Sequence, residues 1–417
     1  MVFVNSREES SLKINIIGLG YIGLPTALML AAKGLDVVGT DIDNAKIESL
    51  NNRQITFEEK SLYDLFYAAV DNGIIFSTSK VSADMYIISV PTPYMKENKK
   101  IDAGYVAVAV QEVLDICEKG SIVVIESTVS PGTIDQFVRP IVKAKGLVTG
   151  QDIHIVHAPE RIIPGNMIYE LEHNSRTIGA DDRNIGEKVK SVYQSFCKGK
   201  IVVTNIKTAE MTKVVENTYR DINIAFANEL TKICHQADLN VYEVIEIANM
   251  HPRVNILSPG PGVGGHCISV DPWFLVGDYP GLANIILAAR KINDSMPEFV
   301  LERIVTIMEQ HSITDVSKVG IYGLTYKEDV DDIRESPTLQ MLECMKKHLA
   351  CGVKVYDPYV KADVVANQYH SLEKFLNDIE IVVIMVGHKE IIDRQENLSG
   401  KIILDTKNVL KIDKYLL

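Results

Sequence analysis

The sequence has no apolar run close to the roughly 18 residues that a membrane-spanning helix needs, so we expect no membrane partner. Basic residues are outnumbered, with 43 Lys and Arg against 55 Asp and Glu and a net charge of -12. Nucleic acids bind basic faces, so a nucleic-acid partner is not expected. The six cysteines include no CxxC pair, and no signal-peptide pattern precedes them. We therefore expect reduced thiols in a cytoplasmic protein.

Histidine spacing also excludes a class of enzyme. The ten histidines form no HExxH motif and no Cys/His cluster with the spacing of metal ligands. A metal-dependent enzyme is therefore not expected. The length of 417 residues is enough for about three domains, each with its own core.

A glycine-rich turn lies between a predicted strand and a predicted helix near the N-terminus. The strand covers residues 13–17, the turn reads GLGYIG at 18–23, and the helix covers 24–33. A second strand over 36–40 ends at Asp41, whose carboxylate can bind an adenosine ribose and would repel a 2′-phosphate. The pattern therefore predicts an NAD site that is formed by Gly18, Gly20, Tyr21, Ile22, Gly23 and Asp41.

Three further parallel strands are predicted over residues 85–90, 121–125 and 153–156. The first two are apolar on both faces, as buried parallel strands are. Ligands of such sheets bind beyond the carboxyl ends of the strands. We expect the residues after these ends to line the cofactor crevice, although prolines and threonines there could simply punctuate loops: Pro91, Thr92, Glu126 and Thr128, with the Glu160 carboxylate at the same edge.

Residues 208–236 contain no proline or glycine and predict a long helix. One face is apolar and is expected to pack against protein: Val215, Tyr219, Ile222, Phe226 and Ile233. The opposite face is polar: Glu210, Lys213, Asn217 and Asn228. Lys213 and Asn217 are one turn apart, and asparagine is unfavourable inside helices, so a functional edge is favoured over a solvated face. A helix of this length also fits the spine of a homodimer.

Cys267 follows a run rich in glycine and proline, PGPGVGGH at 259–266, and stands four residues before Asp271. Glycine allows the main chain to approach a ligand, so the thiol is expected on a loop. The other cysteines lie in ordinary apolar or amphipathic stretches and are expected to be small packed side chains: Cys117, Cys197, Cys234, Cys344 and Cys351. Together with the dinucleotide motif, Cys267 indicates an oxidation through a covalent sulfur adduct.

After a helical segment over 282–310, four buried strands are predicted over residues 318–323, 353–357, 381–386 and 402–405. The glycine turn of this second sheet is incomplete, so we expect a ligand other than a second NAD. Lys327 and Arg334 supply cations where a phosphorylated ligand could lie, although a surface loop of mixed charge would have the same pattern.

Taken in chain order, these segments resemble the UDP-glucose/GDP-mannose dehydrogenase family from Lys13 onward. The matching segments are GLGYIGLP at 18–25, VPTP at 90–93, ESTVSPGT at 126–133, APERIIPG at 158–165, the Lys213/Asn217 helix, GPGVGGHCISVDPWF at 260–274 and GLTYKEDVDDIRESP at 323–337. HPRVNI at 251–256, followed by PGPGVGGHC, is most similar to the members that act on UDP-N-acetyl-D-mannosamine.

The resemblance implies an α/β fold: two Rossmann-like domains with doubly wound parallel sheets, joined by a central helical domain with a long helix. The implied boundaries are a flexible leader over 1–12, an NAD-binding domain over 13–200, a central domain for dimerisation and catalysis over 201–310, and a nucleotide-sugar domain over 311–417. It implies Cys267 as the nucleophile, with Lys213 and Asp271 handling protons and Asn217, Thr128 and Glu160 as neighbours. The implied substrate contacts are Glu160, Arg161, Lys213, Asn217, Arg253, Gly264, Lys327 and Arg334.

The implied reaction is a four-electron, NAD-dependent oxidation of the C6 hydroxyl of a UDP-sugar, through a thiohemiacetal and a thioester on Cys267. UDP-glucose members carry a second glutamate four residues after the position of Glu160, where this chain has Pro164, which weakens glucose as the substrate. UDP-N-acetyl-D-mannosamine is therefore expected first, with UDP-N-acetylglucosamine or UDP-glucose as alternatives. Two other functions stay open: a two-electron alcohol dehydrogenase that stops at the carbonyl, and a non-catalytic sensor of NAD and nucleotide sugar.

Overall fold

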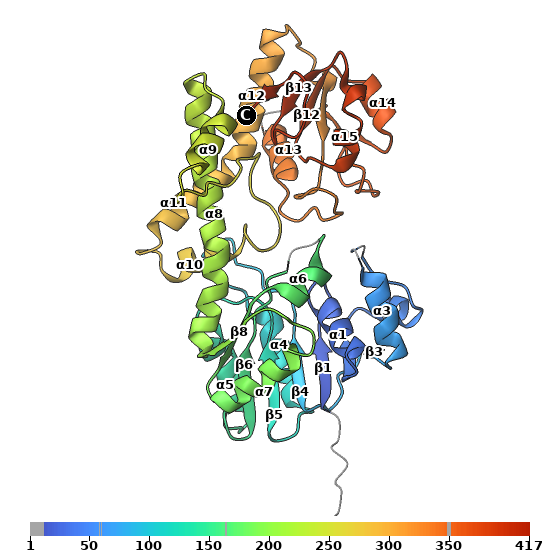
Figure 1. Cartoon of the computed structure of the whole chain (residues 1–417), viewed down its shortest axis with the longest axis vertical. Helices are drawn as coiled ribbons and strands as arrows, with labels where there is room; N and C mark the ends of the chain where they lie inside the picture. The colour runs from blue at the N-terminus through green and yellow to red at the C-terminus, as the bar shows by residue number, and fades with distance from the viewer. Residues whose placement is uncertain (1–11, 58, 60, 163–164, 348–351) are drawn as a thin grey trace, which may run out of the picture. The chain divides into compact units, whose positions relative to one another are not determined.

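The computed structural model describes residues 12–57, 59, 61–162, 165–347 and 352–417. Most of the predicted leader, Pro164 and Cys351 lie outside these ranges. The chain forms two compact units, one ending at Val214 and the other beginning at Val215 (Figure 1). No helix in the described ranges is long and apolar enough to cross a membrane.

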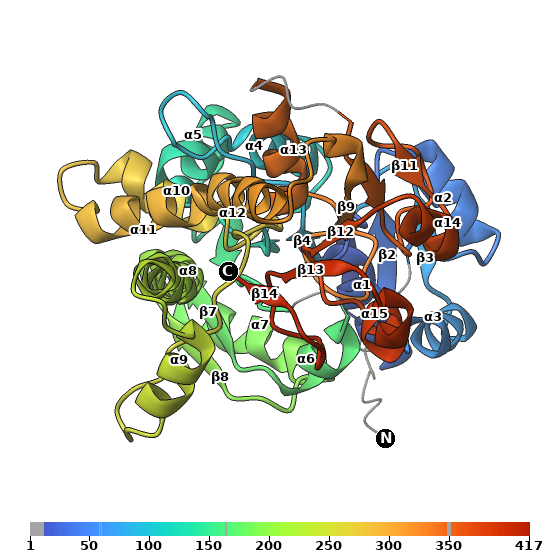
Figure 2. The ribbon, with the colours of Figure 1, turned by 90° about the horizontal axis from the view of Figure 1, so that it is seen from above.

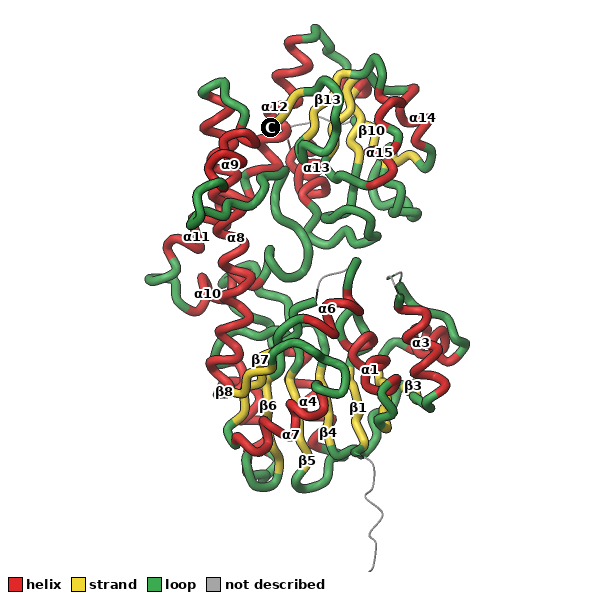
Figure 3. Tube along the Cα trace, in the orientation of Figure 1, coloured by secondary structure: helices red, strands yellow, loops and turns green. Residues whose placement is uncertain are grey.

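The first unit is built on one sheet (Figure 3). Its strands are β1 (Lys13–Ile17), β2 (Asp36–Thr40), β3 (Ile75–Ser77), β4 (Met85–Ile88), β5 (Ser121–Ile125), β6 (Ile153–His157), β7 (Arg176–Ala180) and β8 (Ile201–Thr204). Its helices are α1 (Gly23–Ala32), α2 (Asn44–Asn51), α3 (Leu62–Asp71), α4 (Gly104–Leu114), the π-helix η1 (Ile134–Val138), α5 (Arg139–Ala144), α6 (Met167–His173) and α7 (Arg183–Tyr193).

The strand order of this sheet is β3-β2-β1-β4-β5-β6-β7-β8, and its pairs are parallel except β6 with β7. The order reverses on either side of β1, which is the topological switch point where α/β sheets bind ligands. The predicted strands 36–40 and 121–125 are confirmed in full, whereas β4 ends two residues before the predicted limit. It ends there because the chain turns toward Pro91, which cannot continue a central strand.

The second unit contains the helices α9 (Val241–Asn249), α10 (Asp271–Asp278), α11 (Asn284–Asp294), α12 (Met296–Gln310), the 3-10 helix η2 (Val316–Lys318), α13 (Pro337–Lys347), α14 (Leu372–Asn377), α15 (Lys389–Asp393) and the 3-10 helix η3 (Gln395–Leu398). Its strands are β9 (Val319–Tyr322), β10 (Lys354–Tyr356), β11 (Gln368–Tyr369), β12 (Ile381–Ile384), β13 (Ile402–Asp405) and β14 (Tyr415–Leu416).

The second sheet is parallel, in the order β11-β10-β9-β12-β13-β14. The four predicted strands are confirmed as β9, β10, β12 and β13. The two edge strands were not predicted, because two residues are too few to show a period. Apolar clusters pack around this sheet, including Val383 with Met341 and Ile384 with Phe375. The predicted fold class, with two parallel-dominated α/β sheets and a helical region between them in the chain, is therefore confirmed.

The predicted long helix is α8 (Ile206–Gln236), which Figure 2 views along its axis. Its predicted orientation is wrong. Apolar residues that were expected to pack are 47% to 61% exposed: Val215, Tyr219, Phe226 and Ile233. The polar face is buried instead: Glu210, Lys213, Asn217 and Asn228. The reversal is possible because these polar groups find hydrogen-bond partners in the protein, as Glu210 does by accepting from the backbone N–H of Gly132 and Ile134.

Candidate active site

The predicted dinucleotide turn connects β1 to α1. Gly18 has a φ of +92°, and a methyl side chain there would lie 2.5 Å from the Ser89 carbonyl oxygen. Gly20 is different, since a methyl group there would meet no atom within 4 Å. The space over Gly20 is what a pyrophosphate needs to approach the main chain. Tyr21 and Ile22 are half-buried and lead into Gly23, where α1 begins. The turn therefore fits the predicted dinucleotide.

Asp41 follows β2 and is buried beside this turn. One oxygen of its carboxylate accepts from the Leu19 backbone N–H at 2.8 Å and from Lys46 Nζ at 2.8 Å. Burial raises the pKa of Asp41, but these bonds and one from the Asp43 N–H outweigh burial and leave the pKa below its usual value. The carboxylate is thus charged and fixed where a ribose would bind.

The loops after β4 and β5 are joined by direct hydrogen bonds. Thr92 Oγ1 donates to the Thr128 carbonyl at 2.6 Å, and Ser127 Oγ donates to the Val90 carbonyl at 2.7 Å. Thr92 is buried, Thr128 is half-buried and Pro91 is exposed. The structure therefore brings Thr92 and Thr128 together at the carboxyl edge of the sheet, as predicted for a cofactor crevice.

Glu160 lies just beyond β6 and is buried in an ion pair with Arg176, which opens β7. The antiparallel direction of β7 explains this pair, because its first residue lies beyond the carboxyl end of β6. Arg176 is also 3.7 Å from Glu126, which accepts at 3.0 Å from the Tyr193 hydroxyl. Arg161 donates to the Thr177 hydroxyl at 2.8 Å and so ties this loop to β7.

The two carboxyl groups beside Arg176 differ in charge. Burial, followed by the effect of Glu160, raises the pKa of Glu126 to about 8, while the Arg176 cation and the Tyr193 hydroxyl act in the opposite direction. At neutral pH, Glu126 therefore carries a proton and Arg176 pairs with Glu160. Glu126 was expected to line the crevice, but it is buried against Tyr193. Sequence analysis missed Arg176 and Tyr193; the one available signal was a charged residue at the start of an apolar strand.

Three asparagines on α8 hold the segment 255–271. Asn223 accepts from the Leu257 N–H at 2.9 Å and donates to the Asn255 carbonyl at 2.8 Å. Further along the segment, Asn228 accepts from the Gly260 N–H at 2.9 Å. Asn217 Nδ2 donates to Asp271 Oδ2 at 2.6 Å, with both side chains buried. These bonds give a physical reason for the repeated asparagine on this helix.

Cys267 is exposed on the loop that leads into α10. Its carbonyl accepts from the N–H of Val270 at 3.1 Å and of Asp271 at 2.8 Å. Asp271 then opens α10 with its carboxylate held by Asn217. The structure therefore presents the thiol on a loop, as predicted, and brings Asp271 and Asn217 together. Lys213 is buried one turn before Asn217 on the same helix.

The cysteine loop packs against the segment between β9 and α13. A methyl group at Gly264 would lie 2.6 Å from the Glu335 carbonyl oxygen, and one at Gly265, whose φ is +85°, would lie 2.8 Å from the Tyr326 ring. The Gly265 N–H also donates to the Arg334 carbonyl at 3.0 Å. Glycine is required here because the two segments touch through their backbones.

The remaining predicted substrate residues lie around these segments. Arg334 is exposed and its guanidinium pairs with Asp332 in the same loop, at 2.6 Å. Lys327 is half-buried and Arg253 is exposed. Burial, followed by the Arg334 cation, lowers the pKa of His266.

Models of one protein family match most of the chain. Three models of the UDP-glucose/GDP-mannose dehydrogenase family match it: the NAD binding domain over residues 12–197, the central domain over 207–295 and the UDP binding domain over 320–412.

Individual proteins match almost end to end. The chain is 43% identical over 409 residues to the UDP-N-acetyl-D-mannosamine dehydrogenase of Methanocaldococcus jannaschii, covering 95% of this chain and 92% of the relative. It is 38% identical to the NDP-N-acetyl-D-galactosaminuronic acid dehydrogenase of Ralstonia nicotianae, with coverage of 95% and 96%. The native structure of the UDP-N-acetyl-mannosamine dehydrogenase of Staphylococcus aureus superimposes with a TM-score of 0.87 at 41% identity, over 97% of this chain and 98% of that one.

Proposed function

The chain belongs to the UDP-glucose/GDP-mannose dehydrogenase family and is an NAD-dependent nucleotide-sugar dehydrogenase, and we propose that it oxidises UDP-N-acetyl-D-mannosamine to UDP-N-acetyl-D-mannosaminuronate. The observation that carries this choice of sugar is the 43% identity over 95% of the chain to a relative of that specificity. The 38% identity to a relative named for an N-acetylgalactosamine derivative makes another UDP-N-acetylhexosamine the second candidate.

Oxidation of the C6 alcohol to a carboxylate removes four electrons. The turn at Gly18–Gly23 and Asp41 would hold NAD, which would supply the hydride acceptor in each of two rounds. A base, or a water held by Lys213 and Asp271, takes the hydroxyl proton. The bond from Asn217 Nδ2 to Asp271 Oδ2 at 2.6 Å fixes the carboxylate for this proton transfer. Lys213 and Asn217 are also the donors that would stabilise the oxyanions.

Cys267 makes the second round possible. An aldehyde has no hydride to give until a nucleophile adds to its carbon, and the Cys267 sulfur adds to C6 to form a thiohemiacetal. Loss of hydride from C6 gives a thioester, which water cleaves to release the carboxylate and restore the thiol. The exposed position of Cys267, four residues before the first residue of α10, suits a reactive thiol.

The exposed apolar stripe of α8 supports a homodimer. One face of this helix carries exposed apolar side chains, those of Tyr219, Phe226 and Ile233. Such a stripe needs a partner in a stable protein, and a second copy is the commonest one. We also place the enzyme in the cytoplasm, where a catalytic thiol stays reduced.

The test is a panel of UDP-sugars scored by NADH formed per sugar consumed. UDP-N-acetyl-D-mannosamine should give two NADH and a uronic acid, with a higher kcat/KM than UDP-N-acetylglucosamine, UDP-N-acetylgalactosamine or UDP-glucose. A yield of one NADH with an aldehyde product would reduce the enzyme to a two-electron dehydrogenase. Tight binding of both ligands without turnover would indicate a sensor.

A further inference from the structure

The first sheet has a characteristic arrangement at its ribose site. After β1, the Gly18 N–H donates to the carbonyl of Thr40 at the end of β2, at 2.8 Å. The next N–H, that of Leu19, donates to Asp41 at 2.8 Å. The acid after β2 is thus held against the glycine turn, with Lys46 as its side-chain partner.

The second sheet repeats this arrangement. After β9, Gly323 has a φ of +99°, close to that of Gly18, and its N–H donates to the Tyr356 carbonyl at 2.8 Å. The next N–H, that of Leu324, donates to Asp357 at 2.6 Å. Asp357 therefore occupies the place in the second sheet that a ribose-binding acid occupies in the first.

Asp41 and Asp357 differ in the side chain that contacts each carboxylate. His388, from the loop after β12, is fully buried, and its Nε2 lies 3.2 Å from Asp357 Oδ2. Its Nδ1 accepts from the Asp329 backbone N–H at 2.9 Å. Because a backbone N–H only donates, the ring proton is on Nε2, where it faces Asp357. The imidazole thus contacts the acid and connects Asp357 to residue 329.

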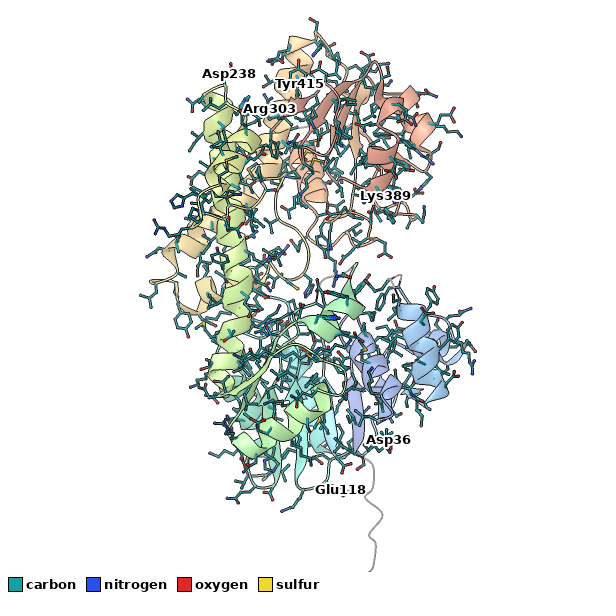
Figure 4. The ribbon with its side chains drawn as sticks, in the orientation of Figure 1. Asp36, Glu118, Asp238, Arg303, Lys389 and Tyr415 are labelled. Carbon is teal, nitrogen blue, oxygen red and sulfur yellow. The ribbon has the colours of Figure 1, made fainter. Side chains whose placement is uncertain are left out.

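Residue 329 belongs to the segment between β9 and α13, which also carries Lys327 and Arg334. The contacts around Asp329 converge on its carboxylate: the N–H of Lys389, the first residue of α15 (Figure 4), donates at 3.0 Å, and the Tyr359 hydroxyl donates at 3.1 Å. The Thr325 hydroxyl donates to the Lys327 carbonyl at 2.9 Å and lies 3.3 Å from His388 Nε2.

We propose that His388 is a positioning residue for the nucleotide sugar: its Nε2 faces Asp357 and closes the second sheet to a dinucleotide, and its Nδ1 holds the segment of Lys327 and Arg334 in place by accepting from the Asp329 N–H. This inference rests on the proposed function only in taking this segment to contact the UDP moiety. The same segment touches the cysteine loop at Gly265, so its order also bears on Cys267.

Two substitutions separate the two ring nitrogens. In His388→Asn, the carboxamide oxygen can take the place of Nδ1 and accept from the Asp329 N–H. In His388→Gln, the amide nitrogen can take the place of Nε2 and donate to Asp357, while the Asp329 N–H loses its acceptor. Calorimetric titration with UDP should show binding weakened about tenfold in His388→Gln and within about twofold of wild type in His388→Asn. NAD affinity should be unchanged in both.

Hydrogen exchange gives a second measurement. The amide of Asp329 should be protected in the wild type and in His388→Asn, and should exchange faster in His388→Gln even if that variant is less stable overall. Equal UDP affinity in the three proteins, or equal losses in both variants, would overturn the role of His388. Because UDP carries no sugar, an error in the proposed sugar would change the substrate panel and leave this pattern intact.

Discussion

Cys267 is the residue on which the proposed chemistry depends most. Replacing it by alanine should stop uronic acid formation, with a loss of roughly a thousandfold or more in kcat for the second oxidation, because the aldehyde then has no nucleophile to form a hydride donor. Mass spectrometry of the product and NADH yield measure this. The matched control is Cys344→Ala, at a half-buried cysteine on α13. Full acid production by Cys267→Ala would exclude the covalent route.

Glu126 should make the stability of the protein depend on pH. Its pKa is about 8 in the folded chain against an ordinary 4.5, so its contribution is fully present below 4.5 and is lost as the pH rises through 8. Glu126→Gln mimics the protonated acid. In the wild type, Glu126 should make the unfolding free energy fall by up to about 1.4 kcal/mol per pH unit in this window. This decrease should be missing in Glu126→Gln.

The measurement is urea denaturation at several pH values, with Glu160→Gln as the control. That second variant leaves the Arg176 cation buried without its ion-pair partner and should lose about 3–5 kcal/mol at pH 7. Parallel stability curves for wild type and Glu126→Gln between pH 4.5 and 8 would show that Glu126 is not the protonated member of the pair.

At this scale the sequence predicted the residues that lie in local motifs, and missed those that pair across the fold. Asp41 follows its glycine turn by a known spacing, and Cys267 stands in an unusual run. Tyr193, by contrast, reaches Glu126 across 67 positions of chain. No local pattern reports such a pair, because it exists only once β5, β7 and α7 have packed.

Among the elements, α8 should contribute to both stability and activity through its polar face. Asn228→Ala would remove the acceptor of the Gly260 N–H and the donor to the Asn293 carboxamide oxygen, which should cost about 1–3 kcal/mol of unfolding free energy. It should also lower kcat, because Gly260 begins the loop that carries Cys267. Denaturation and steady-state kinetics measure the two effects. Glu229→Ala, at the exposed next position, should change neither, and a similar effect of both variants would contradict the role of Asn228.

The position and length of α8 were predictable from the absence of proline and glycine, but its buried face was not. Periodicity identifies two faces and says nothing about which one the chain itself covers. The apolar face would normally be chosen. Here the polar face is buried because the segment 255–271 supplies backbone partners for Asn223 and Asn228.

For the whole molecule, the exposed stripe of α8 predicts the oligomeric state. Phe226→Asp places a charge in the proposed dimer contact, and sedimentation velocity at micromolar concentration should change from a dimer to a monomer. Ile75→Asp, at an exposed apolar residue on the edge strand β3, is the matched control and should leave the dimer intact. A wild-type monomer, or a dimer of Phe226→Asp, would remove the proposal.

The arrangement of two parallel sheets was predictable because buried parallel strands are apolar on both faces. The boundaries of the three predicted domains stay a prediction, since the two compact units divide inside α8. The repeated acid arrangement at Asp357 was not foreseen, because the glycine turn of the second sheet is incomplete as a motif. It became visible only when Asp357 and Leu324 were seen to repeat the geometry of Asp41 and Leu19.

The three asparagines of α8 that bind the segment 255–271 limit how this protein can change in length. Each residue added to a helix rotates everything after it by about 100°. One residue inserted between Asn217 and Asn223 would rotate the amides of Asn223 and Asn228 away from the segment 255–271, while Asn217 would keep its bond to Asp271. Substitution can be tolerated along this helix, but insertions and deletions cannot, and family members that differ in size should differ in their loops.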